Sequence, residues 1–139
     1  MRFRLPRMRA VRPVLPRLGY APKADGHPDP GEVVWAWVAY EDDPTQGKDR
    51  PVLVIGMEGT ELLALAMTSR DHDVDAAQES RDGREWMDIG AGAWDAQRRP
   101  SEVRLNRVLR LDPAGVRREG AAVSRETFDA VLEAARPYL

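Results

Sequence analysis

Two apolar runs joined by a polar loop lie near the start of this chain and narrow the folds open to it. The first run, residues 32–40, has apolar side chains at both odd and even positions, which is typical of a strand covered on both faces. The second run, Pro51–Met57, is nearly continuous, and a proline is tolerated at the first position of a strand. Pro44 and Gly47 interrupt the segment between the runs, so we predict two strands joined by a loop.

The rest of the chain continues the pattern of short strands and then changes to a helix. The further predicted strands are Leu62–Thr68, which forms a hairpin with the run before it, Glu85–Ile89, and Glu102–Leu105 with Val108–Leu111, as two strands or one bent strand. Ser124 is a favourable N-cap residue, and apolar side chains follow it at helical spacing until Pro137. The pattern predicts a mainly β protein, a small and strongly bent antiparallel barrel with a C-terminal helix.

Composition excludes several classes of site. The 139 residues suit one domain, and the absence of cysteine excludes disulfides and thiolate metal sites. His27 and His72 are too few for a histidine-rich metal centre. No apolar run approaches the roughly 20 residues that span a bilayer, and prolines and arginines interrupt any secretory signal. Carboxylate-only ion binding stays open, although the aspartates show no EF-hand spacing. We expect a cytoplasmic protein without a metal site or a cofactor.

Charge divides the chain into a basic tail and an acidic body. Residues 1–24 contain seven cations and no acid, whereas residues 25–139 contain 14 cations and 23 acids. The tail is rich in proline, so we predict a disordered extension over residues 1–29 and the barrel domain over 30–139. Three interpretations of the tail stay open: a solvated extension, a non-specific phosphate contact, and a start codon placed too early.

Four segments of this chain carry motifs in a fixed order. They are Gly31-Glu32-Val33-Val34-Trp35, Asp49-Arg50-Pro51-Val52-Leu53-Val54-Ile55, Leu63-Ala64-Leu65-Ala66-Met67-Thr68-Ser69, and Ser101 to Asp112. Phe128 to Leu132 falls on the predicted C-terminal helix. In order and spacing, these segments resemble the PemK/MazF toxin family of bacterial type II toxin–antitoxin systems, over roughly residues 30–136.

The resemblance implies a fold, an activity and a set of partners. The fold is an SH3-like barrel, and the protein is a homodimer. The activity is sequence-selective cleavage of single-stranded RNA without a metal, which leaves 2′,3′-cyclic phosphate and 5′-hydroxyl ends. A cognate antitoxin inserts an acidic, disordered segment over the RNA groove, and some family members bind promoter DNA together with their antitoxin.

The resemblance also indicates three catalytic residues. Arg50 matches the family's catalytic arginine, whose planar fork can hold two phosphoryl oxygens and stabilise their charge. Thr68 matches the active-site threonine, whose hydroxyl can bond a phosphate or steer the attacking group. Ser69 assists them, or is an ordinary turn residue. Each residue also has a purely structural explanation. Arg50 could be an ordinary surface arginine at the start of a strand, and Thr68 could be a β-branched residue that suits a strand.

Four further residues are candidates for RNA binding. Gln46 and Lys48 lie in the first loop, which contacts RNA in the family, although a solvated turn also explains them. Trp94 could stack on a base, although strand tryptophans are commonly core residues. His72 suits proton transfer, but a histidine in a polar loop is commonly just solvated. The general base stays open among Asp71, His72 and Asp73.

Acidic residues favour a second hypothesis. Asp42, Asp43 and Asp49 crowd the first loop beside Arg50, and the domain as a whole is acidic, which is unfavourable for a polyanionic ligand. The alternative is a non-catalytic SH3-like barrel that binds nucleic acid or a protein partner. An endoribonuclease leaves cyclic-phosphate ends on RNA, whereas a binding barrel leaves none.

Overall fold

The computed structural model describes residues 17–22, 28–69 and 83–139. Within these ranges the chain forms seven strands, one α-helix and two short 3₁₀ helices. The strands are β1 (Arg17–Leu18), β2 (Glu32–Ala39), β3 (Gly47–Glu58), β4 (Glu61–Thr68), β5 (Trp86–Gly90), β6 (Ser101–Leu111) and β7 (Arg117–Ala122). The helices are η3 (Pro113–Gly115), α2 (Arg125–Ala135) and η4 (Arg136–Tyr138). None of these helices has the length and apolar character needed to cross a bilayer.

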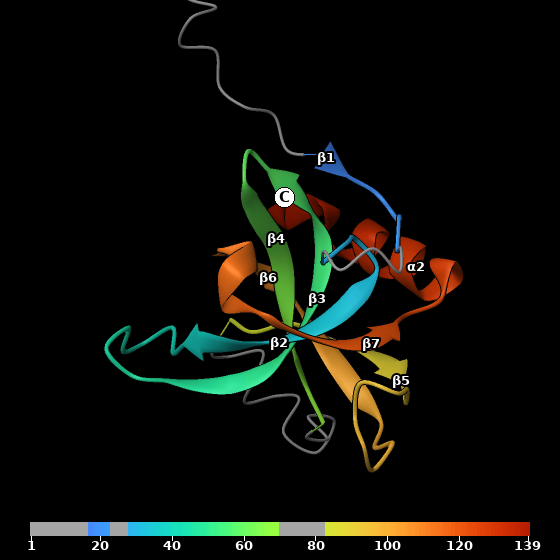
Figure 1. Ribbon diagram of the computed structural model, residues 1–139, viewed down its shortest axis with the longest axis horizontal. Coiled ribbons are helices and arrows are strands. Elements are labelled where there is room, and N and C mark those ends of the chain that lie inside the picture. The colour runs from blue at the N-terminus through green and yellow to red at the C-terminus, as the bar shows by residue number, and fades with distance from the viewer. Residues whose placement is uncertain (1–16, 23–27, 70–82) are drawn as a thin grey trace, which may run out of the picture.

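All the strand pairs are antiparallel, and they form a single curled sheet. The strand order is β5-β6-β4-β3-β2-β7, with β1 added beside β3. In Figure 1 the long β3–β4 hairpin runs through the centre of the molecule, and α2 lies to one side of it. The predicted fold class, a small and strongly bent antiparallel barrel with a C-terminal helix, is confirmed.

Each face of the curled sheet covers its own apolar cluster. Val33, Leu53 and Leu65 belong to the cluster that α2 covers, whereas the neighbouring Val34 and Val52 belong to the cluster on the other face. Successive side chains of a strand point to opposite faces. The apolar residues at both odd and even positions of residues 32–40 therefore reflect a strand that is buried on two sides, as predicted.

The C-terminal helix begins and packs as its sequence predicts. The Ser124 hydroxyl accepts a hydrogen bond from the backbone N–H of Thr127 at 3.1 Å, which caps the first turn of α2. Phe128, Val131 and Ala135 form the buried stripe of the helix and join the core cluster on that face. The helix thereby covers one face of the sheet.

Part of the N-terminal segment lies against the sheet. Backbone pairing joins Arg17 to Met57 and Leu18 to Gly56. The Tyr20 hydroxyl donates a hydrogen bond to the Val123 carbonyl at 2.8 Å, and its ring centroid is 5.4 Å from that of Phe128. These contacts hold part of residues 17–22 against the core, and the division into an extension over residues 1–29 and a domain over 30–139 stays a prediction. The rest of the basic tail lies outside the described residues.

Two strands differ from the sequence-based prediction. β3 begins at Gly47 rather than Pro51 because residues 47–51 pair with β2 before the pairing with β4 starts at Val52. Pro51 thus lies where one edge of the strand is unpaired, and a missing N–H is tolerated there. β7 was not predicted, since its RREGAA sequence has no apolar alternation, and backbone pairing with β2 holds it in the sheet.

Candidate active site

Arg50 and Thr68 face each other across the β3–β4 hairpin. The pairing register places Leu53 opposite Leu65 and Val52 opposite Ala66. Extended by two residues along both strands, this register brings Arg50 opposite Thr68. Residues that lie opposite each other in an antiparallel pair point to the same face of the sheet, so the two side chains share a face. The turn at residues 59–60 pairs Glu58 directly with Glu61, and a one-residue register shift between Val54 and Gly56 then sets the pairing that reaches Arg50 and Thr68.

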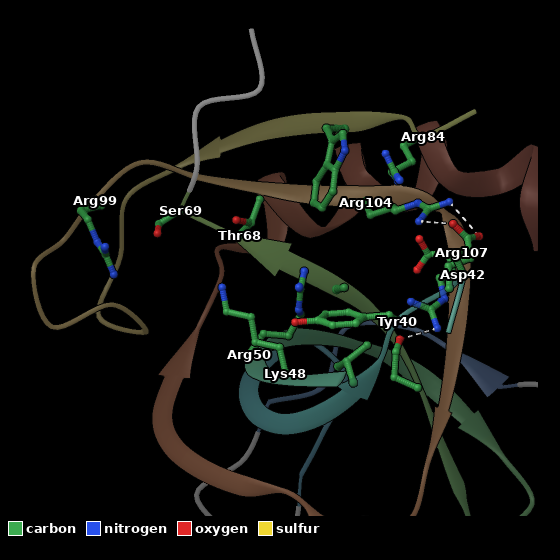
Figure 2. Close-up of a pocket in the computed structure, with 15 residues that line it drawn as sticks. Tyr40, Asp42, Lys48, Arg50, Thr68, Ser69, Arg84, Arg99, Arg104 and Arg107 are labelled. Atoms are coloured by element: carbon green, nitrogen blue, oxygen red, sulfur yellow. Dashed lines mark hydrogen bonds and ion pairs between the residues drawn. The ribbon is translucent and has the colours of Figure 1, made fainter. Parts of the chain in front are cut away.

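A cleft of about 780 Å³ opens over this pair of residues. Figure 2 shows Arg50, Lys48 and Thr68 projecting into a common space, with arginines from the later strands along its other side. A smaller pocket of about 210 Å³ lies beside the cleft. Lys48, Arg50, Thr68, Ser69 and Arg99 line both, so the two cavities meet at the predicted catalytic residues.

The Arg50 guanidinium is partly buried and has a free donor. Its Nε atom is buried, and no hydrogen-bond acceptor reaches it among the residues that the structure describes. Burial lowers the pKa of Arg50, the nearby Tyr40 raises it, and the positive charge of Arg107 lowers it again. A cation that is stripped of water and lacks a full set of partners is poised to bind an anion.

A bulge in β6 adds further cations to the cleft. Leu65 of β4 pairs with Val108 and Met67 pairs with Val103, so Ala66 alone faces the four residues 104–107. Such a bulge bends the strand and redirects side chains. Here it brings Arg104 and Arg107 into the lining of the cleft. The sequence allowed either two short strands or one bent strand between Glu102 and Leu111, and the structure has one bent strand, β6.

Positive charge dominates this cleft although the domain is acidic. The charged residues in its lining are Lys48, Arg50, Arg84, Arg99, Arg104 and Arg107 against Glu41 and Asp42. Six cations and two carboxylates leave an excess of four positive charges. The unfavourable net charge of the domain therefore does not describe the surface that an anion would meet here, because the field in a cleft is set by its own lining.

Two of the three acids that seemed to oppose anion binding form hydrogen bonds with other residues. Asp49 accepts two hydrogen bonds from the Arg117 guanidinium of β7. Asp43 accepts hydrogen bonds from the backbone N–H and hydroxyl of Thr45, at 3.1 and 2.6 Å, and so shapes the loop between β2 and β3. Asp42 lines the cleft and is exposed.

The Arg99 side chain in the cleft is held by an acid on the neighbouring loop. Its Nε donates to Asp95 at 2.8 Å. Burial raises the pKa of Asp95, but the hydrogen bonds from Arg99 and from the Gln97 backbone outweigh it, and the pKa lies below its usual range. Asp95 therefore stays ionised near neutral pH and keeps Arg99 at the junction of the two cavities.

Apart from Trp94, the predicted site residues fall into three groups. Arg50, Thr68, Ser69 and Lys48 lie together in the cleft. Gln46 is exposed in the loop after β2, and neither cavity includes it in its lining. His72, Asp71 and Asp73 lie outside the described residues.

Trp94 has a packing role in the structure. Only 6% of the residue is exposed, and its indole N–H donates to the Ser101 hydroxyl at 2.9 Å. It belongs to the core cluster, and its remaining surface lines the smaller pocket. Because so little of the ring is exposed, we do not retain a base-stacking role for Trp94.

Sequence reasoning missed several residues of the cleft. The lining also includes Tyr40, Arg84, Trp86, Arg104 and Arg107. Trp86 and Arg104 are directly paired across β5 and β6, and Trp86 and Tyr40 supply the aromatic surface that was assigned to Trp94. The only available signal was the cluster of arginines within an interrupted strand pattern at residues 104–110.

The fold and the site together define a small, curled β-barrel with a cation-lined cleft at the end of its central hairpin. A comparison with protein families finds that the family of PemK-like, MazF-like toxins of type II toxin–antitoxin systems matches residues 29–139. The chain belongs to this family. A search of curated proteins finds no significant match. Family membership implies a cognate antitoxin as a partner.

Proposed function

We propose that this chain is a metal-independent endoribonuclease toxin that cuts single-stranded RNA at a phosphodiester held between Arg50 and Thr68. The observation that supports this most is the placement of the two residues opposite each other on neighbouring strands, in a cleft with four excess positive charges. The buried Nε of Arg50 adds a donor with no acceptor among the described residues. A phosphoryl oxygen would satisfy it.

The reaction uses the RNA as its own nucleophile. The ribose 2′-oxygen bonds to phosphorus as the P–O5′ bond breaks, the 2′-hydroxyl proton passes to a base, and the departing 5′-oxygen takes up a proton. The products are a 2′,3′-cyclic phosphate and a 5′-hydroxyl. Arg50 stabilises the charge that develops on the phosphoryl oxygens, and its high pKa makes it a charge stabiliser rather than a base.

Other residues hold the strand around the scissile group. Thr68 and Ser69 offer hydroxyls to the phosphate or the attacking ribose, and Lys48 contributes a charge to an adjacent phosphate. Tyr40 and Trp86 offer aromatic surface on which bases can stack. Gln46 as an RNA contact and His72 in proton transfer remain part of the proposal, with the general base unassigned.

The proposed partners follow from the family and the charge of the cleft. The antitoxin would cover the cleft with an acidic segment, which its excess of cations supports. The homodimer and the joint binding of promoter DNA rest on family membership alone. Co-expression with the adjacent small open reading frame should relieve growth arrest by the toxin, and sedimentation of the purified chain measures the dimer.

The central experiment maps RNA ends after incubation with the purified chain in EDTA. We expect new 5′-hydroxyl and cyclic-phosphate ends with the wild type and almost none with Arg50→Ala. Arg110→Ala is a matched control, because Arg110 is an exposed arginine of β6 outside the lining of both cavities. Equal cleavage by Arg50→Ala would overturn the proposed chemistry. RNA binding without any new ends would favour the non-catalytic barrel instead.

A further inference from the structure

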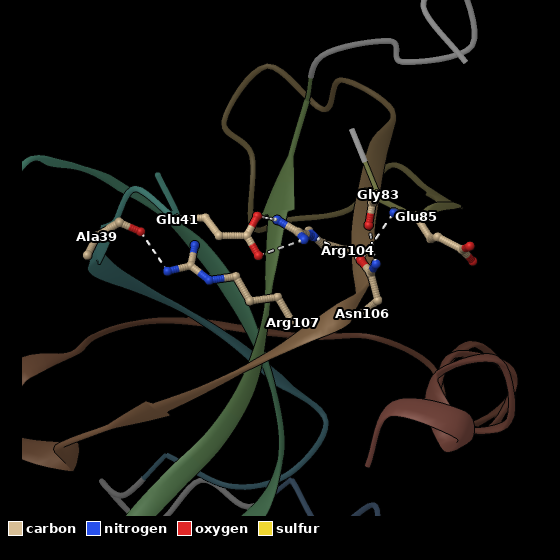
Figure 3. Close-up of polar contacts among 7 residues, drawn as sticks. All are labelled: Ala39, Glu41, Gly83, Glu85, Arg104, Asn106 and Arg107. Atoms are coloured by element: carbon tan, nitrogen blue, oxygen red, sulfur yellow. Dashed lines mark hydrogen bonds and ion pairs between the residues drawn. The ribbon is translucent and has the colours of Figure 1, made fainter. Parts of the chain in front are cut away.

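A second guanidinium fork in the cleft already holds an anion. Nη1 and Nη2 of Arg104 donate to the two carboxylate oxygens of Glu41, at 2.9 and 3.1 Å (Figure 3). The Arg104 side chain is only 8% exposed, whereas that of Glu41 is 51% exposed. The cation is thus built into the sheet, and the anion comes from the loop that follows β2.

Asn106 fixes the Arg104 guanidinium independently of Glu41. Its Oδ1 accepts from Nε of Arg104 at 3.0 Å and from the backbone N–H of Glu85 at 3.2 Å. The Asn106 amide also donates to the Gly83 carbonyl. Asn106 is therefore anchored to the backbone before β5, and the two outer nitrogens of Arg104 keep their direction when Glu41 leaves.

The position that Glu41 occupies is favourable for an anion. The hydrogen bond from Arg104 lowers the pKa of Glu41, burial opposes this, and the charges of Arg104, Arg107 and Arg84 lower it further, so the pKa lies below its usual value. Arg107 donates to the Ala39 carbonyl at 2.8 Å, which holds it at the base of the same loop. Its charge also acts on Arg50, so the two anion positions share one cleft.

We infer that Arg104, with Arg107 beside it, is a second phosphate subsite, and that Glu41 is a resident carboxylate which the RNA backbone displaces. A carboxylate and a phosphodiester each present two oxygens to a guanidinium fork, so one can replace the other without a change in the arginine. The inference rests on the proposed function, since it takes the ligand to be the strand whose scissile phosphate lies at Arg50.

This arrangement makes Glu41 a built-in competitor of the substrate. A strand that fills the Arg50 position gains the second subsite only after it releases the carboxylate. Removing the negative charge of Glu41 should therefore strengthen the binding of any single strand with a phosphate in reach of Arg104. A comparable charge change elsewhere in the molecule should not.

The test measures binding of a fluorescent, mixed-sequence oligodeoxynucleotide of about ten nucleotides, a length in the range that single-strand sites cover. It lacks 2′-hydroxyls and cannot be cut by the proposed reaction. We expect Glu41→Gln to bind it about tenfold more tightly than the wild type, the size of effect that one hydrogen bond to a charged group gives. Glu58→Gln is the matched control.

Glu58 suits this comparison because it also pairs with an arginine, Arg110, at 3.3 Å. It lies eight residues along β3 from Arg50, or about 26 Å at the rise of a strand. Both variants change net charge equally, so general attraction to a polyanion is matched. Affinities of Glu41→Gln and Glu58→Gln within twofold of each other would overturn the inference.

Further measurements test this inference separately from the proposed function. Thermal unfolding establishes that each variant is folded, and Glu41→Ala replaces Glu41→Gln if the amide variant is not. Tighter binding of the uncut DNA by the Glu41 variant supports the subsite even if the wild type cuts no RNA. A polyglutamate peptide that gains affinity while the oligonucleotide does not would assign the subsite to acidic polypeptides and overturn the assignment to RNA.

Discussion

Asp49 of β3 is bound by Arg117 of β7 and is thereby kept from the neighbouring Arg50. Two hydrogen bonds, at 3.2 and 2.5 Å, join the guanidinium to the two carboxylate oxygens. Both side chains are about half exposed, so the pair adds little to stability. Its main effect is electrostatic, since an acid next to the candidate catalytic arginine has a cation of its own.

We predict that Arg117→Gln weakens binding of a single-stranded oligonucleotide several-fold and lowers the free energy of unfolding by no more than about 1 kcal/mol. The freed Asp49 carboxylate would then act on Arg50 and on a phosphate bound there. Fluorescence anisotropy measures the binding. The double variant Asp49→Asn with Arg117→Gln should recover most of the loss, and failure to recover would show that Arg117 contacts the strand itself.

Arg50 should reduce the stability of the fold while it serves the site. Its buried Nε has no acceptor among the described residues, so burial of the guanidinium is not compensated at that atom. We predict that Arg50→Met leaves the free energy of unfolding unchanged or raises it by up to about 1 kcal/mol. RNA cleavage should fall by about a hundredfold or more, as for the loss of one donor to a charged transition state.

Urea unfolding and a single-turnover cleavage assay measure these two effects. Arg110→Met is the control, since this side chain is half exposed on β6 and pairs with Glu58, away from both cavities. It should change neither quantity by much. An Arg50→Met variant that loses several kcal/mol of stability would instead give Arg50 a structural role.

The hydroxyl of Thr68 can be tested by two substitutions of similar size. Thr68→Val keeps the β-branched shape but removes the hydroxyl, and Thr68→Ser keeps the hydroxyl but removes the methyl group. We predict that cleavage falls at least tenfold in Thr68→Val and much less in Thr68→Ser, as a role in hydrogen bonding requires. The opposite order would indicate that Thr68 serves the packing of β4.

The predictable part of the site depends on the central hairpin. The short turn between Glu58 and Glu61 pairs β3 with β4, and a register shift between Val54 and Gly56 brings Arg50 opposite Thr68. Local turn chemistry and apolar runs are both visible in a sequence, so the hairpin that brings these two residues near each other follows from them, whereas the register shift does not. The family resemblance then assigns roles that the spacing does not.

The remainder of the cleft depends on features that a pattern of apolar residues does not encode. The β6 bulge changes which side chains face the cleft. The sequence of residues 104–107 does not show where the extra residues of the bulge are inserted. The net charge of the chain was also a poor guide to the charge of the cleft, because it counts Asp49 and other acids that are paired with cations of their own. Position, and not composition, determines the charge of the cleft.

The ion pair between Glu41 and Arg104 should respond to acid. Because the pKa of Glu41 lies below its ordinary value of 4.5, its contribution to stability is present above that pH and is lost as the pH falls through the lowered value. We predict that Glu41→Gln is less stable than the wild type by about 1 kcal/mol at pH 7, since Glu41 is half exposed. The difference should shrink below pH 4.5.

Denaturant unfolding of both proteins across this range of pH measures the difference. Because the same substitution is predicted to strengthen oligonucleotide binding, stability and binding should change in opposite directions at neutral pH. A stability difference that stays constant down to about pH 3 would show that the Glu41 carboxylate does not carry the effect.

Tyr20 provides the last prediction, because it joins the N-terminal segment to the core. Its hydroxyl donates to the Val123 carbonyl at 2.8 Å, and its ring covers Gly31 so closely that an added Cβ would lie 2.6 Å from it. Gly31 has a φ of +101°, so other residues would be strained there as well. We predict that Tyr20→Phe costs about 1 kcal/mol of stability and Tyr20→Ala about 2–3 kcal/mol.

Thermal and urea unfolding distinguish a packed segment from a loose one. Tyr138→Phe is a suitable control, because that ring is exposed near the C-terminus and its hydroxyl interacts with Glu85 at the surface, so its loss should change the stability much less than Tyr20→Phe does. Removal of residues 1–22 should destabilise the protein as much as Tyr20→Ala does, since both remove the same anchor. If the shortened chain unfolds at the wild-type midpoint, the segment does not contribute to the folded domain.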